Sequence, residues 1–160
     1  MLVVDPDEAN LNRVASALRA GGREVIAEMS LPRGLQRVRS EFQALAALFV
    51  ATDVAEPALA PALESFRAEF AFSRTPAVLL TKPKQDVMAE EASKSFSHVE
   101  FVNALVDEAA LEDALTRGRR KAGHAPLEPA LAQSLALQAA ETLRSIAVDG
   151  RTVYDFGAAE

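Results

Sequence analysis

Apolar runs that each end in a polar residue restrict the fold of this chain more than any other feature. Such runs are Leu2–Val4 before Asp5, Ala46–Ala51 before Thr52-Asp53, and Ala77–Leu80 before Thr81. Apolar runs without polar alternation are typical of strands buried on both faces of a parallel sheet. The carboxyl ends of such strands meet at one edge, where open α/β sheets bind their ligands. We therefore expect these polar ends to converge there, as a place for a small cation or a phosphoryl group.

The segments between the runs have helical patterns, so that strands and helices alternate along the chain. Gly21-Gly22 is suited to end the first helix, and Ser30 to cap the second. The five expected strands are Leu2–Val4, Glu24–Met29, Ala46–Ala51, Ala77–Leu80 and Val99–Leu105. The alternation predicts a three-layer α/β sandwich with a five-stranded parallel sheet in the order 2-1-3-4-5. The predicted core positions of its central strands are Val4, Val50, Leu79 and Phe101.

The amino-acid composition limits the classes of protein and of partner that are compatible with this chain. With 160 residues, 49% apolar and 25% charged, the chain can bury the core of one ordinary domain. A net charge of -6 argues against a general nucleic-acid binder. The absence of cysteine excludes a thiolate metal site and fits a reducing compartment. No apolar run approaches the roughly 20 residues that span a bilayer, and no charged n-region precedes the first strand. We expect a cytoplasmic protein with no nucleic-acid or membrane partner.

The composition changes near the end of the fifth helix, which predicts a domain over 1–122 and a linker with a helical extension over 123–160. The basic run Arg117–Lys121 places positive charge at a helix C-terminus, where it is favourable. A more specific alternative is that the run forms a short phosphate-binding patch. A further helix is expected from Pro129, with one apolar face formed by Leu131, Leu135, Ala139, Leu143 and Ile146. The sequence stops within what reads as another element, Tyr154–Glu160. The extension is therefore expected either to pack on the sheet domain or to begin a further domain.

Taken in order, these motifs resemble those of response-regulator receiver domains, from Leu2 to about Gly118. The resemblance is carried by Leu2-Val3-Val4-Asp5, by Val50–Pro57 and by Pro76–Thr81. Receivers of two-component systems accept a phosphoryl group from a histidine kinase on an aspartate, with Mg²⁺ held by acidic residues. The resemblance implies that Asp53 is the phosphoacceptor, that Thr81 is the switch hydroxyl, and that Asp5 and Asp53 would hold the metal. Residues 135–147 bear a fainter resemblance to a helix of a HEAT-type repeat.

Two departures from the receiver pattern affect the chemistry. Pro6 stands where the second acidic residue belongs, and Ala104, followed by Leu105, stands where receivers carry a lysine at the end of strand five. Lys82 and Lys84 lie on a different loop. Because a buried carboxylate without a cation is costly, we expect Asp53 to be partly solvated, protonated, or bonded to Thr52, Thr81 or the backbone. These losses indicate a pseudo-receiver with no required cofactor and with weak Mg²⁺ binding at most.

The first functional hypothesis is a signalling module that regulates an attached output domain or a partner protein. Its expected surface is helix four, strand five and helix five, with candidate contacts at Phe96, Val99, Phe101 and Val87-Met88. Oligomerisation is left open.

Two alternatives belong to other classes. In one, Asp53 is a working phosphoacceptor of a phosphorelay, with Glu56 or Asp7 replacing the missing metal ligand. In the other, Asp5-Pro6-Asp7 after a strand is the motif of a haloacid-dehalogenase-type phosphatase, with Asp5 as nucleophile and Asp7 as general acid. Turnover of a generic phosphate ester would distinguish the second from the first.

Overall fold

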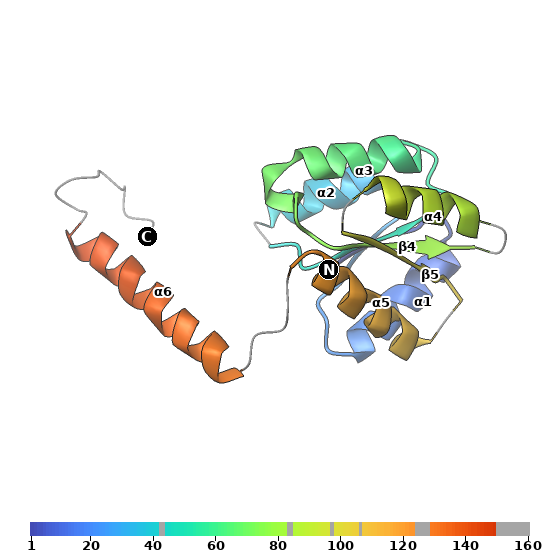
Figure 1. Ribbon diagram of the computed structural model, residues 1–160. Coiled ribbons are helices and arrows are strands. Elements are labelled where there is room, and N and C mark those ends of the chain that lie inside the picture. Colours follow the sequence, from blue (N-terminus) through green and yellow to red (C-terminus); the bar gives the residue numbers. More distant parts are fainter. Residues whose placement is uncertain (42–43, 83–84, 97, 106, 124–128, 150–160) are drawn as a thin grey trace. The chain divides into compact units, whose positions relative to one another are not determined.

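The computed structural model describes residues 1–41, 44–82, 85–96, 98–105, 107–123 and 129–149. The chain divides into two compact units, Met1–His124 and Ala125–Glu160. The first unit contains the sheet and the helices that cover it, and the second contains the long helix α6 (Pro129–Asp149) (Figure 1). None of the described helices is long and apolar enough to cross a membrane.

The sheet of the first unit has five parallel strands in the order β2-β1-β3-β4-β5, as the sequence predicts. The strands are β1 (Leu2–Val4), β2 (Ile26–Glu28), β3 (Leu48–Ala51), β4 (Ala77–Thr81) and β5 (Val99–Asn103). Val4 is in register with Val50, and Val50 with Leu79. Because the central strands are parallel and in register, the residues that follow them lie at the same edge of the sheet.

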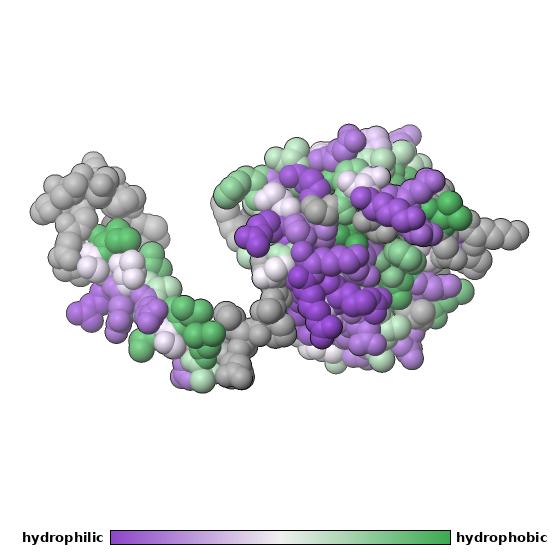
Figure 2. Space-filling view, viewed as in Figure 1, coloured by the Kyte–Doolittle hydropathy of each residue, from purple (hydrophilic) through white to green (hydrophobic). Residues whose placement is uncertain are grey.

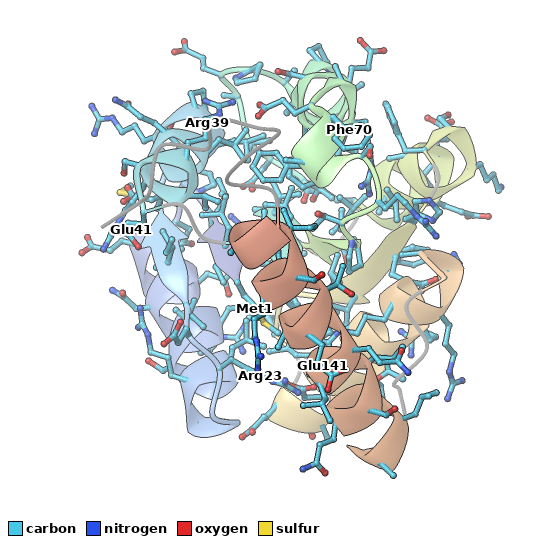
Figure 3. The ribbon with its side chains drawn as sticks, turned by 90° about the vertical axis from the view of Figure 1, so that its left-hand side faces the viewer. Met1, Arg23, Arg39, Glu41, Phe70 and Glu141 are labelled. Atoms are coloured by element: carbon cyan, nitrogen blue, oxygen red, sulfur yellow. The ribbon has the colours of Figure 1, made fainter. Side chains whose placement is uncertain are left out.

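Helices cover both faces of this sheet, which gives the predicted three-layer sandwich (Figure 1). The helices are α1 (Glu8–Ala20), α2 (Leu31–Ser40), α3 (Leu59–Ala68), α4 (Asp86–Ser95) and α5 (Glu108–Lys121). One core cluster joins the sheet to α2, α3 and α4, and a second joins it to α1 and α5. Arg23, labelled in Figure 3, binds Glu112 of α5 through two N–H donors at 3.2 and 3.1 Å, which links the end of α1 to α5.

The predicted core residues Val4, Val50 and Leu79 are fully buried. The prediction for Phe101 is wrong: 37% of this residue is exposed. The reason is that β5 is an edge strand with a neighbour on one side only.

Two members of the basic run of α5 are ion-paired to the sheet. Glu100 of β5 is almost buried, and its carboxylate lies 3.2 Å from Arg117 Nε and 2.5 Å from Lys121 Nζ. These pairs give part of the run a structural role, since they neutralise a buried acid on the edge strand.

A helix is predicted from Pro129, and α6 begins at that residue. Figure 2 shows apolar surface along it, and its exposed large apolar residues are Leu131, Leu135, Leu137, Leu143 and Ile146. Its resemblance to a HEAT-type helix stays a prediction.

Truncation of Leu79 should strongly destabilise the first unit. Leu79→Ala removes fully buried atoms from the central strand β4, and such changes cost about 2–5 kcal/mol of unfolding free energy. The matched control is Leu105→Ala, the same change at a residue that is 71% exposed. Urea denaturation followed by circular dichroism measures both. Equal, small effects would contradict the central position of β4.

Candidate functional site

The turn after β1 holds Asp5 in a fully buried position. Asp5 Oδ1 accepts a hydrogen bond from the backbone N–H of Asp7 at 2.8 Å, and Asp5 Oδ2 accepts one from the side-chain amide of Asn10. Asp7 is exposed, and its carboxylate caps α1 by accepting from the N–H groups of Ala9 and Asn10. Asp7 therefore stabilises its own helix, as N-cap aspartates do.

The end of β3 is connected to the loop after β4. Thr52 is buried, and its hydroxyl lies within hydrogen-bond distance of Gln85 Oε1 and 3.3 Å from the Leu80 carbonyl. Gln85 Oε1 also accepts from the backbone N–H of Lys82 at 3.2 Å. Gln85, which directly precedes α4, thus fixes the backbone of Lys82 beside β3.

Lys82 supplies the cation that the sequence pattern of strand five lacks. Its ammonium nitrogen lies 2.6 Å from Asp53 Oδ2 and 3.8 Å from Asp5 Oδ1. The hydrogen bond to Asp53 is the main cause that raises the pKa of Lys82 above its ordinary value, with further contributions from the charges of Asp5, Asp53 and Asp7 against partial desolvation. Lys82 therefore stays protonated between the two carboxylates.

This ion pair corrects the expectation that Asp53 would have no cation. That expectation considered only the end of strand five, where Ala104 stands in place of a lysine. The cation comes instead from Lys82, the residue that follows β4. The side chain of lysine is long enough to reach Asp53 across neighbouring strand ends. Partial solvation, one of the expected alternatives, is present, because the Asp53 side chain is 31% exposed. The hydroxyls of Thr52 and Thr81 bond to other acceptors.

Thr81 and Ala104 close the end of the sheet on the side of β5. Thr81 is buried, and its hydroxyl lies 3.3 Å from the Val102 carbonyl. The N–H of Ala104 donates to the Thr81 carbonyl at 2.8 Å, and the Ala104 methyl group belongs to the core cluster with α1 and α5. The position assigned to the missing lysine is therefore part of the hydrophobic core.

Asp53 has one paired and one unpaired oxygen. Its side chain is 31% exposed, but Oδ1 is buried and has no hydrogen-bond partner within the described part of the chain. An unpaired buried oxygen is unfavourable. It marks the point where a further donor or cation would stabilise the site.

The residues at this edge do not fit Mg²⁺ as they are arranged. Mg²⁺ requires oxygen ligands in near-octahedral geometry. In the described ranges no group of three or more His, Cys, Asp or Glu could hold a metal ion. The Lys82 ammonium faces both Asp5 and Asp53, where a divalent ion would have to lie.

The chain matches no protein-family model and no curated protein. Among solved structures, it is similar to a response regulator receiver domain protein from Clostridium thermocellum, with 17% identity, TM-score 0.64, and coverage of 74% of this chain and 92% of that one. A chemotaxis response regulator of Vibrio cholerae gives 15% identity, TM-score 0.62, and coverage of 73% and 95%. The fold is that of a response-regulator receiver domain.

A third receiver carries a metal at its site. The receiver domain of a sensor histidine kinase from Pseudomonas aeruginosa, with a magnesium ion coordinated in its active site cleft, gives 23% identity, TM-score 0.58, and coverage of 76% of this chain and 95% of that one. These structural similarities show a shared receiver fold. The site chemistry of the present receiver-like domain is set by its own residues.

Neutralising Lys82 should destabilise the receiver-like domain at neutral pH. Lys82→Gln leaves Asp5 and Asp53 without their cation, and the loss of a hydrogen bond between charged groups costs about 1–3 kcal/mol. Because the folded-state pKa of Lys82 is raised, its contribution is full below the unfolded lysine pKa of about 10.4 and is lost as pH rises through the higher folded value.

The measurement is urea denaturation of wild type and variant at pH 7 and at increasing alkaline pH. The matched control is Lys94→Gln, which removes a lysine from the exposed pair with Glu90 and should leave stability almost unchanged. A stability difference near zero for Lys82→Gln at pH 7 would contradict the ion pair.

Proposed function

We propose that this domain is a degenerate receiver that regulates an attached or partner protein through protein–protein contacts and accepts little or no phosphate at Asp53. The observation that supports this best is the state of the Asp53 carboxylate. One oxygen is bonded to Lys82 at 2.6 Å, and the other is buried. A carboxylate must present a free oxygen to the incoming phosphorus to act as a nucleophile, whereas here Oδ2 is bonded to the Lys82 ammonium and Oδ1 is buried.

The missing groups act in the same direction. Pro6 and Ala104 stand where the second acid and the strand-five lysine of receivers are expected. Each preorganised charge at the transferring group is typically worth about 3 kcal/mol in the transition state. Two such losses would slow phosphoryl transfer by roughly four orders of magnitude.

Lys82 is also the observation that keeps the phosphorelay as the second candidate. An ammonium group near Asp53 could contact phosphoryl oxygens after transfer. The proposed substitutes for the metal ligand favour it less, because Asp7 caps α1 and Glu56 is exposed. The same capping role of Asp7 weighs against the phosphatase, in which Asp7 would be the general acid.

The proposed contact surface lies over α4, β5 and α5. Val87, Phe101 and Leu105 are exposed apolar residues of this region. Val99 is buried and Phe96 packs against the core, so these two candidates serve the fold, and the side chain of Met88 is outside the described set. With a domain boundary near residue 122, this surface would transmit the state of the domain to the extension over 123–160 or to a separate partner protein.

Wild-type protein should gain little or no phosphate when it is incubated with Mg²⁺ and a small phosphodonor such as acetyl phosphate. The physical reason is the pairing of Asp53 with Lys82 and the loss of transition-state charges. Intact mass spectrometry, with quenching at several times, measures the added phosphate.

The negative control is Asp53→Asn, which should behave as the wild type does, and a metal-dependent receiver under the same conditions is the positive control. Stoichiometric phosphate on wild type that is lost in Asp53→Asn would reject the degenerate receiver and establish the phosphorelay. Multiple turnover of a generic phosphate ester would instead establish a phosphatase.

A further inference from the structure

We propose that the ammonium group of Lys82 takes the place of a divalent cation between Asp5 and Asp53, so that removing the amine opens a divalent-cation site in this domain. The inference rests on the proposed function, because it explains how the acidic site of a receiver is kept from metal chemistry. It concerns a tethered cation, which no dissociation or chelation can remove.

The first support is the position of the amine. Two carboxylates from different strand ends face one nitrogen, at 2.6 Å for Asp53 Oδ2 and 3.8 Å for Asp5 Oδ1. Two like charges in a partly buried site repel each other and need a cation nearby. Lys82 meets this need, and a divalent ion at the same carboxylates would be repelled by the ammonium.

The second support is the way in which the lysine is held. Its backbone N–H donates to Gln85 Oε1 at 3.2 Å, and the same oxygen accepts from the buried hydroxyl of Thr52. The loop that carries the amine is therefore fixed to β3. A tethered group has a high effective concentration at its site, so Lys82 competes well against ions in solution.

The third support is the set of oxygens that remains when the amine is removed. Asp5 Oδ1 and Asp53 Oδ2 lose their shared cation, and Asp53 Oδ1 already has no partner in the described part of the chain. Mg²⁺ usually keeps several waters and takes only one or two protein carboxylates, and oxygen ligands also suit Mn²⁺. The acidic pair would then be able to accept a divalent ion that is excluded while Lys82 is in place.

The experiment titrates MnCl₂ into the full chain of wild type, Lys82→Gln, Lys82→Ala and Lys82→Arg, by calorimetry and by thermal melting. Lys82→Gln and Lys82→Ala should bind one Mn²⁺ at least about tenfold more tightly than wild type. Their melting temperatures should rise with Mn²⁺, because an ion that binds only the folded state stabilises it. Lys82→Arg keeps the charge and should respond as the wild type does.

Two controls separate this site from nonspecific binding. The double variant Lys82→Gln/Asp53→Asn should lose the gained affinity, and Lys94→Gln makes the same charge change at an exposed ion pair and should gain none. Lys82→Gln keeps most of the side-chain length in case Lys82→Ala does not fold. Wild-type affinity equal to that of both neutral variants, or no binding by either neutral variant, would overturn the proposal.

The outcome is independent of the test of function, because the titration contains no phosphodonor. Phosphate on wild-type Asp53 with a gained Mn²⁺ site in Lys82→Gln would reject the degenerate receiver and keep the tethered cation. If wild type gains no phosphate and Lys82→Gln gains no Mn²⁺ site, the tethered cation is rejected and the degenerate receiver is kept.

Discussion

The ion cluster of Lys82 with Asp53 and Asp5 is the interaction on which the functional edge of this domain depends. It joins residues that lie just beyond three adjacent strands, β1, β3 and β4. The parallel register brings the carboxylates together, and their repulsion must be balanced by positive charge. At metal-dependent phosphoryl-transfer sites a divalent ion supplies the positive charge. In this domain Lys82, on the loop after β4, supplies it.

The surrounding hydrogen bonds keep this cluster in one arrangement. Asn10 and the turn before α1 hold Asp5, while Gln85 and Thr52 hold the backbone of Lys82. The acids and the amine therefore come from three different strand-to-helix connections that meet at one site. A change in the pairing of Lys82 would first alter the loop before α4, which is next to the proposed contact surface.

The sequence predicts the sheet, its order and most of its core, because β1, β3 and β4 are apolar without interruption and must be buried on both faces. It misplaces Phe101, since an edge strand keeps the apolar composition of its neighbours but is exposed on one side. The capping role of Asp7 carries a sequence signal, because aspartate is a preferred residue directly before the start of a helix. Lys82 could not be assigned by matching strand five, because its amine reaches the site through side-chain length from another strand end.

The central claim is that Lys82 is bound to Asp53 in the folded protein, and NMR of the lysine ammonium groups tests it most directly. With ¹⁵N-labelled lysine, we predict a slowly exchanging Lys82 Nζ signal that disappears in Lys82→Gln, is lost or shifts strongly in Asp53→Asn, and is unchanged by MgCl₂. If the Lys82 signal exchanges as fast as those of solvent-exposed lysines such as Lys94, or if Mg²⁺ displaces it, the account is contradicted.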